Sequence, residues 1–149
     1  MGKYRFVFDV LRELVPNRLM IEDRADLAEF GKFLLRKPVV VPIPLTGKRV
    51  RERGFNQAAV IASQLGSNFG LGVDELLWRK EGILGHQVGK NREARFKAVA
   101  GVFQVRRNFT AENILIVDDV WTTGATLREA AKILKSGGAK MVWGFVLGR

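Results

Sequence analysis

The hydrophobic positions of the chain form helical and extended segments that alternate along its length. Apolar residues recur at helical spacing in residues 6–15, 25–35, 55–65 and 126–135, and less clearly in residues 92–99. Apolar or β-branched runs predict strands over residues 38–44, 73–78, 102–105, 113–118 and 141–147. This alternation predicts an α/β fold with a mainly parallel, twisted sheet flanked by helices.

The C-terminal third of the chain holds the clearest elements. Residues 113–118 form a continuous apolar run, which is typical of a parallel strand buried on both faces. Together with the helix predicted at 126–135 and the strand at 141–147 it makes a βαβ unit. Trp78 and Trp143 lie in apolar strands, so we expect both in the core.

The remainder of the chain is less regular. Pro42 and Pro44 indicate a strand at the edge of the sheet, or one that ends in a rigid loop. Residues 79–91 have no clear period and are expected to be a loop. We therefore expect an N-terminal helical segment, residues 1–37, that packs on or covers a core domain of residues 38–149.

Composition limits the class of protein. A chain of 149 residues with 47% hydrophobic content is long enough for one domain with a core. It has no cysteine, which excludes a disulfide framework and a cysteine-based zinc site. Neither a membrane-spanning run nor the apolar region of a signal peptide is evident, so we expect a cytoplasmic protein without membrane attachment. The net charge of +10 favours anionic partners, either nucleic acid or a small ligand with several phosphates.

The segment ILIVDDVWTTGATL combines two acids with a threonine loop. Asp118 and Asp119 come at the end of a predicted strand, where open α/β sheets bind their ligands. Residues 120–125 lead into a helix N-terminus, whose amides and dipole favour an anion. The threonines of this loop can donate hydrogen bonds, and Gly124 lets the backbone approach a phosphate closely. The pattern predicts a phosphate in the loop and hydroxyl groups or a metal at the carboxylates.

Three other interpretations compete for this segment. A Walker B strand requires a Walker A loop, and the nearest glycine-containing stretch, residues 85–91, has the wrong spacing and no Ser or Thr. A response regulator requires several further βα units, but only 30 residues follow Asp119. The remaining alternative is a buried strand whose acidic end merely caps the next helix.

VDDVWTTGAT closely resembles the motif that binds phosphoribosyl pyrophosphate (PRPP) in type I phosphoribosyltransferases. Residues 41–57, VPIPLTGKRVRERGFNQ, resemble the ComF-like branch of that family, and Gln87 followed by Arg95 is a third match. The resemblance extends from about residue 25 to the C-terminus. It implies the type I phosphoribosyltransferase fold and an Mg²⁺-dependent transfer of a phosphoribosyl group from PRPP to a nitrogen nucleophile, with release of pyrophosphate.

The resemblance also implies a role for each matching residue. Asp118 and Asp119 would be the catalytic pair, binding the ribose hydroxyls directly or through Mg²⁺. The 5-phosphate would be held by Val120, Thr122, Thr123, Gly124, Ala125 and Thr126. The pyrophosphate would lie against Pro44, Leu45, Thr46, Arg49, Arg51 and Arg53. Gln57 would help to shape the site, and Gln87 and Arg95 would close over the ligand.

Some features depart from the family pattern. The N-terminal zinc module that the family often carries needs cysteines, which this chain lacks. Ala98 stands where an asparagine is expected after Arg95, and Trp121 is bulky for a variable loop position. The Trp121 side chain would either shield the site or contact a nucleobase. His86, the lone histidine, is expected to be an exposed loop residue.

These observations support two hypotheses of function. The first is a PRPP-dependent phosphoribosyltransferase linked to competence for DNA uptake or to nucleotide salvage. The second is a non-catalytic PRPP sensor or nucleic-acid-associated regulator, favoured by the net charge and by basic runs at residues 48–53, 90–97 and 106–107. Its partners would be single-stranded DNA or the DNA-uptake machinery. The apolar segment 6–15 would serve as the contact of a homodimer.

Overall fold

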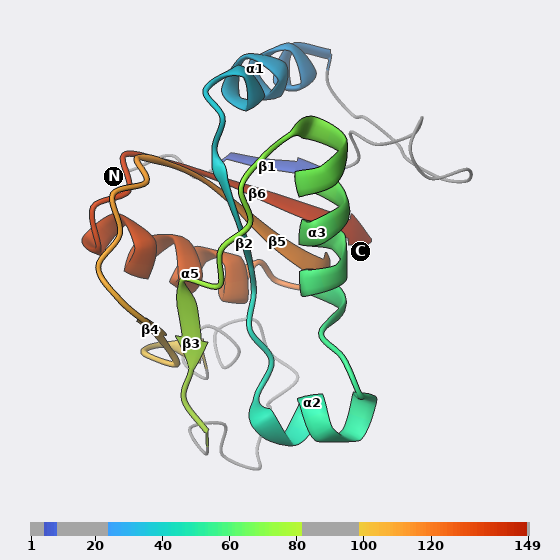
Figure 1. Ribbon diagram of the computed structural model, residues 1–149, viewed down its shortest axis with the longest axis vertical. Helices are drawn as coiled ribbons and strands as arrows, with labels where there is room; N and C mark the ends of the chain where they lie inside the picture. Colours follow the sequence, from blue (N-terminus) through green and yellow to red (C-terminus); the bar gives the residue numbers. More distant parts are fainter. Residues whose placement is uncertain (1–4, 9–23, 82–98, 149) are drawn as a thin grey trace.

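The computed structural model describes residues 5–8, 24–81 and 99–148 (Figure 1). The helices are α1 (Arg24–Leu35), α2 (Gly47–Arg53), α3 (Gln57–Phe69) and α5 (Ala125–Ser136). The strands are β1 (Arg5–Phe8), β2 (Val39–Pro42), β3 (Leu77–Arg79), β4 (Phe103–Val105), β5 (Asn113–Val120) and β6 (Met141–Gly148). Within the described part, no helix is both long and apolar enough to cross a membrane.

The main sheet has the strand order β1-β6-β5-β2, and its neighbouring strands are all parallel. Strands β3 and β4 form a separate antiparallel ribbon. Helices cover the main sheet, so the predicted α/β architecture with a mainly parallel sheet is confirmed. The carboxyl ends of parallel strands meet at one edge of a sheet, which brings the segments after β2 and β5 together.

Strand β2 lies at the edge of the main sheet, as its prolines predict. Pro42 lies opposite Val117 of β5, and the Ile43 amide then donates to the Val117 carbonyl at 2.8 Å. On its outer side β2 makes a single bridge, between Val40 and Val73. The Val40 amide donates to the Gly72 carbonyl on the outer side, so the N position of Pro42, two residues on, also faces away from β5. The missing proline N–H therefore costs no bond to β5, and the pairing continues by one residue toward the site.

Alternating side chains of β5 and its neighbours form two hydrophobic clusters, one on each face of the sheet. One cluster combines strand residues with α1 and α3: Val40, Leu115, Val117, Trp143 and Phe145 with Phe30, Phe33, Ile61, Ala62 and Leu65. The other combines them with α5 and the ribbon: Val41, Ile114, Ile116, Val142 and Val146 with Leu127, Ala130, Leu134, Leu77 and Phe103. Figure 1 shows α3 and α5 on opposite sides of β5. The strand that carries the acidic pair is thus packed from both faces.

Helix α3 begins where its capping residue places it. Asn56 is extended, and its side-chain oxygen accepts from the Ala58 amide at 3.1 Å. The helix ends at Gly70, whose φ of 61° is the left-handed conformation of a C-cap. The predicted helix at 55–65 was therefore right in kind, but it began two residues early and ended short of Phe69. Phe55, which precedes the cap, is 54% exposed.

The basic segment 48–53 forms the short helix α2, which its charge pattern did not predict. The Thr46 hydroxyl caps it by accepting from the Arg49 amide at 3.3 Å, and Gly54 ends it with a φ of 81°. No residue of α2 is buried. Because the helix has no apolar face, hydrophobic periodicity could not reveal it.

Two predictions near the ends of the ribbon and the sheet were wrong. Residues 5–8 form strand β1 beside β6, not the start of a helix over 6–15, because a short apolar run fits either element and pairing with a distant strand decides. The strand predicted at 73–78 is confined to Leu77–Arg79 and exposes 44% of Trp78, which is therefore not a core residue. Trp143 is buried as predicted, at 4% exposure, and stacks on Phe33 with ring centroids 5.4 Å apart.

Several predictions fall outside the described residues: the rest of segment 6–15 with its dimer contact, most of the loop 79–91, and the helix 92–99 apart from Val99. The helix predicted at 25–35 is confirmed as α1. The division of the chain at residue 37 stays a prediction.

Candidate functional site

The acidic pair lies at the carboxyl end of β5, as the sequence predicts. Asp118 is opposite Val146 of β6, and β5 continues to Val120. The Asp119 amide donates to the Asp118 carboxylate at 2.9 Å, which fixes that side chain against its own backbone. Both carboxylates are half-buried. They therefore stand at the rim of the sheet, within reach of a ligand placed beyond the strand.

The environment of Asp118 changes its ionisation. Its pKa is raised to about 7, chiefly because burial disfavours the charged form. The backbone N–H of Asp119 opposes this shift, whereas the Asp119 carboxyl group adds to it, and the positive charge of Arg79 again lowers the pKa. Asp118 thus exchanges a proton near neutral pH in the ligand-free protein. A cation or hydroxyl group brought to this carboxylate would favour its charged form.

A backbone hydrogen bond and contacts of the Trp121 ring fix the conformation of the threonine loop. The Trp121 amide donates to the Gly148 carbonyl at 2.7 Å, tying the loop to the end of β6. Gly124 has a φ of 74°, and a Cβ there would overlap the Trp121 ring. Trp121 is half-buried and packs against the core cluster on the α5 side of the sheet. The bulky residue thus supports the loop from within, and it explains why position 124 needs glycine for space as well as conformation.

Helix α5 begins at this loop with an anion-binding geometry. Gly124 is its N-cap and offers no side chain, and the first turn of α5 contains no acidic residue. The Ala125 amide donates to the Thr123 hydroxyl at 3.4 Å, so this threonine already orders the first turn. The helix dipole and the amides of the first turn face outward beyond β5, where they favour a phosphate.

The segment after β2 lies at the same edge, next to the acidic pair. Asn56 fixes this segment, because its side-chain amide donates to the Ile43 carbonyl at 3.0 Å while its oxygen caps α3. Pro44 and Leu45 follow, and Thr46 begins α2. The structure therefore brings the segment predicted for pyrophosphate beside Asp118 and Asp119, on a turn anchored at both ends.

The three arginines predicted for pyrophosphate are not equivalent. Arg49, Arg51 and Arg53 all lie on the exposed helix α2. Only Arg49 lines the pocket beside Thr46. Arg53 instead donates to the Gln57 side chain at 3.4 Å, across the junction of α2 and α3. Gln57 thus supports this junction, and Arg51 and Arg53 provide general positive charge.

The pocket has a volume of about 340 Å³ and is lined by Thr46, Lys48, Arg49, Glu52, Arg79, Lys80, Glu81 and Val102. Arg79, Lys80 and Glu81 were not among the residues predicted from the sequence. They enter the site because the β3–β4 ribbon ends beside α2. A hint was present in LLWRK, where two basic residues directly follow an apolar run and precede a glycine-containing stretch.

The described residues supply only some of the ligands that an Mg²⁺ ion needs. They contain no group of three or more acidic or histidine side chains suited to a metal. Asp118 and Asp119 alone fit the usual magnesium arrangement of one or two carboxylates, with the remaining oxygens supplied by water and phosphates. Gln87, Arg95 and His86 lie outside the described residues.

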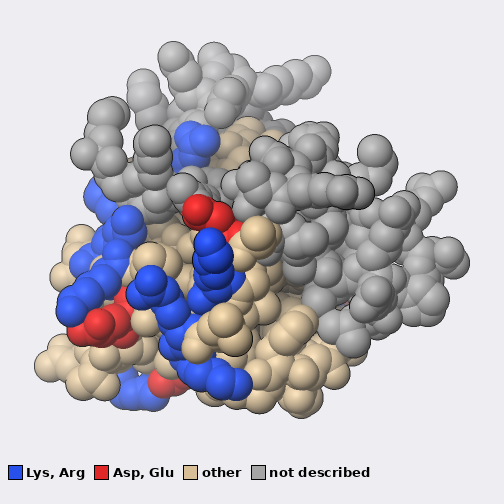
Figure 2. All heavy atoms as spheres, turned by 90° about the horizontal axis from the view of Figure 1, so that it is seen from above, with Lys and Arg blue, Asp and Glu red and all other residues tan. Residues whose placement is uncertain are grey.

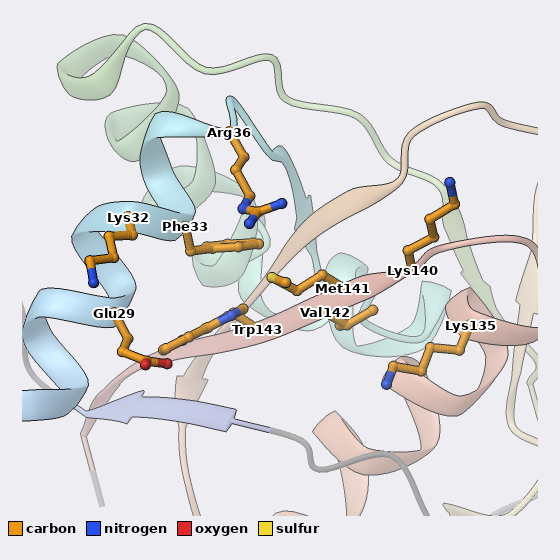
Figure 3. Close-up of a pocket in the computed structure, with 9 residues that line it drawn as sticks. All are labelled: Glu29, Lys32, Phe33, Arg36, Lys135, Lys140, Met141, Val142 and Trp143. Atoms are coloured by element: carbon orange, nitrogen blue, oxygen red, sulfur yellow. The ribbon is translucent and has the colours of Figure 1, made fainter.

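A second, larger pocket of about 440 Å³ lies at the opposite end of the sheet (Figure 3). It is lined by Glu29, Lys32, Phe33, Arg36, Lys135, Lys140, Met141, Val142 and Trp143. Met141 starts β6 and pairs with Asn113 at the start of β5. The length of β5, at about 3.3 Å per residue, separates this pocket from the acidic pair. The two pockets therefore cannot share one small ligand.

Comparison with known proteins agrees with this geometry. Residues 37–147 match the family described as phosphoribosyl transferase domain, the class that the parallel sheet, acidic pair and threonine loop define. "Competence protein ComFC" of Streptococcus pneumoniae is 35% identical over 99% of this chain and 61% of that protein. "Competence protein ComFC" of Bacillus subtilis is 37% identical over 73% of this chain and 43% of that protein. "Orotate phosphoribosyltransferase" of Sphingopyxis alaskensis is 32% identical over 87% of this chain and 72% of that protein.

The chain belongs to the ComF-like branch of the type I phosphoribosyltransferase family. The chain spans 61% and 43% of the lengths of the two ComFC proteins that it matches.

Proposed function

We propose that the protein binds PRPP with Mg²⁺ and transfers its phosphoribosyl group to a nitrogen nucleophile, releasing pyrophosphate. One observation carries the proposal: the acidic pair and the threonine loop follow β5 at the edge where Thr46 and Arg49 follow the neighbouring strand β2. This edge offers carboxylates for a sugar, a helix N-terminus for its 5-phosphate, and a cationic pocket for a second anion.

Each group would act on a different part of the substrate. Asp118 and Asp119 would hold the ribose hydroxyls, and their negative charge would stabilise an oxocarbenium-like transition state. The first turn of α5 would fix the 5-phosphate and so orient the anomeric carbon. The C1–O bond breaks with its electron pair leaving on pyrophosphate, and the nitrogen lone pair forms the new C1–N bond. Bound Mg²⁺ would neutralise charge on the leaving pyrophosphate.

Calorimetry with PRPP and Mg²⁺ tests the binding step. The native protein should bind, and Asp119→Asn should weaken binding by about tenfold or more because it removes a charged partner of the ribose and metal. Asp74→Asn makes the same chemical change at a surface carboxylate that pairs with Arg107, and it should bind like the native protein. If the native protein does not bind PRPP, the proposal is wrong.

Pyrophosphate release tests catalysis. The native protein should release pyrophosphate from PRPP with at least one member of a panel of purines, pyrimidines and amines. Binding without release for every acceptor would favour a PRPP sensor instead. The names of relatives, which include "DNA utilization protein YhgH" of Salmonella typhi at 29% identity, support a role in DNA uptake or nucleotide salvage.

A second candidate function is nucleic-acid binding at the amino end of the sheet. Four basic side chains line the larger pocket together with only one acidic residue, Glu29. Figure 3 shows Lys32 on α1 and Arg36 directly after this helix, with Lys135 and Lys140 on the other side of the pocket. Figure 2 shows Lys and Arg outnumbering Asp and Glu on the described part of the face seen from above. A polyanion would complement this face.

Salt-dependent binding of a single-stranded oligonucleotide tests this candidate. The double variant Lys32→Gln/Arg36→Gln should bind more weakly and reduce the salt slope by about 0.7 for each phosphate that the protein no longer neutralises. Arg106→Gln/Arg107→Gln removes the same charge from two residues that directly follow β4 and already pair with carboxylates, so it should have little effect. Binding that is absent or indifferent to salt would rule the candidate out.

A further inference from the structure

The pocket at the amino end of the sheet has an apolar floor of packed rings. Phe33 and Trp143 stack with ring centroids 5.4 Å apart, and the Phe30 centroid lies 6.3 Å from the first ring and 5.6 Å from the second. Phe33 and Trp143 are buried, whereas Met141 is only half-buried at the start of β6. Because this floor is packed without a ligand, binding one would require little ordering of side chains.

Arg36 lies above this floor because of the way α1 ends. Its backbone amide donates to the Phe33 carbonyl at 3.0 Å, so the chain still turns here and the two side chains lie on the same side. Figure 3 shows the Arg36 guanidinium turned toward the Phe33 ring. A guanidinium donates two parallel hydrogen bonds to a phosphate and also stacks on planar rings. Arg36 therefore suits a ligand that carries both groups.

Two further cations form the opposite wall of the pocket. Lys135 lies in the last turn of α5, and Lys140 comes directly before β6. Lys140 pairs with Glu112, which is not a lining residue. Together with the two basic residues on the α1 side, these lysines give the pocket an excess of positive charge over its single lining acid, Glu29. An anionic group inside the pocket would offset the repulsion among these cations.

The size and lining of the pocket limit the kind of ligand. Its volume of about 440 Å³ is in the range of cavities that take small organic molecules. An inorganic anion would leave the apolar floor without a contact, and an apolar molecule would leave the cations without one. A nucleic-acid strand needs basic residues along a groove that follows its backbone, whereas these cations surround one cavity. The lining therefore fits a small organic phosphate that carries a planar ring.

We propose that this pocket is a second ligand site, which binds a nucleoside monophosphate with its phosphate between Arg36 and Lys135 and its base against Met141. Strand β6 rises by about 17 Å from Met141 to Val146, the residue opposite Asp118, at about 3.3 Å per residue. The site therefore lies apart from the acidic pair and the threonine loop. Its occupation is independent of PRPP binding, so it goes beyond the proposed function.

Methyl NMR of methionine-labelled protein reports on this pocket directly. The chain has three methionines, of which Met141 lines the pocket, and the variant Met141→Leu identifies its signal. Titration with adenosine monophosphate (AMP) should shift the Met141 methyl signal and reach saturation. AMP bound only at the threonine loop would leave this signal unchanged. Inorganic phosphate and adenosine each lack one part of the ligand, so each should bind at least about tenfold more weakly than AMP.

Substitutions of Arg36 test its role. Arg36→Gln should weaken AMP binding by about tenfold or more, since it removes charge-assisted hydrogen bonds, and Arg36→Lys should lose only part of the affinity because it keeps the charge without the planar fork. The side chain is exposed, so both variants should fold like the native protein. Arg106→Gln is the matched control, because Arg106 pairs with Glu75 outside the pocket, and it should bind AMP like the native protein.

Several outcomes would overturn the inference. AMP that leaves the Met141 signal unchanged would do so, and so would equal AMP affinity in the native protein and Arg36→Gln. Equal affinity for AMP and inorganic phosphate would mean a general anion site instead. A single-stranded oligonucleotide that shifts the Met141 signal at a lower nucleotide concentration than AMP would favour the nucleic-acid candidate. Failure of the native protein to bind PRPP would contradict the proposed function alone, because the two sites do not overlap.

Discussion

The raised pKa of Asp118 makes a definite prediction about stability. The pKa is 3.8 for an ordinary aspartate and about 7 in the folded protein, chiefly because of burial. Between these values the folded protein keeps a proton that the unfolded chain has lost. The stabilising contribution of Asp118 is therefore fully present below about pH 4 and is lost as the pH rises through about 7. A pKa difference of this size corresponds to up to about 4 kcal/mol, at about 1.4 kcal/mol for each pH unit.

The variant Asp118→Asn tests this reasoning, because asparagine has nearly the same shape and cannot ionise. Relative to the native protein, the variant should gain up to about 4 kcal/mol in the free energy of unfolding between about pH 4 and about pH 8. Urea unfolding followed by circular dichroism, with a chelator present to exclude metal ions, measures the difference at each pH. Other titrating groups are common to both proteins and cancel.

Asp74→Asn is the control for the chemical change itself. Its carboxylate lies at the surface in an ion pair with Arg107, and the variant should not gain stability as the pH rises. Suppose that the native protein and Asp118→Asn differ by the same free energy of unfolding at about pH 4 and at about pH 8. Asp118 would then be ionised throughout this range. The burial of this carboxylate would then not govern its charge, and the explanation given for its pKa would be wrong.

Three further substitutions have clear expected outcomes. Gly124→Ala should lower the free energy of unfolding by more than about 1 kcal/mol, because φ is 74° and the new Cβ overlaps the Trp121 ring. The double variant with Trp121→Ala should lose less stability than the sum of the two single losses, because the overlap is then removed. Asn56→Ala should cost about 1–2 kcal/mol in unfolding, whereas Asn56→Asp, which keeps the cap of α3 but not the donor to Ile43, should cost less. Thr46→Ala should weaken pyrophosphate binding in calorimetry through loss of the α2 cap, and Thr46→Ser should not. Equal effects within either conservative pair would contradict the capping roles.

The sheet and its best elements could be predicted because their signals are local. The run from Asn113 to Val117 is apolar after its first residue, and in a protein of this size such a run usually forms a parallel strand buried on both faces. Pro42 likewise marks an edge strand, since it cannot donate to a second neighbour. In both cases the physical constraint lies in the residues themselves, so the sequence sufficed.

Other elements could not be predicted, because tertiary contacts decide them. Residues Arg5–Phe8 form a strand only by pairing with β6, which lies at the other end of the chain. Helix α2 has no buried residue and depends on its Thr46 cap and on Gly54, so hydrophobic periodicity cannot predict it. Trp78 has a large apolar side chain of the kind usually found in a core, but it lies in the two-stranded β3–β4 ribbon and stays partly exposed.

The same distinction divides the candidate site. The residues predicted to bind the sugar and its 5-phosphate lie within nine consecutive positions, from Asp118 to Thr126, so a strand end and a helix start bring them together by short-range geometry alone. The cationic pocket beside Thr46 instead joins Arg49 to Arg79, thirty residues apart on two elements that meet only in the folded protein. A motif can record the first arrangement but not the second. The lining of this pocket should therefore vary more among relatives than the acidic pair and the threonine loop do, because a shift of the β3–β4 ribbon moves Arg79 without touching either of them.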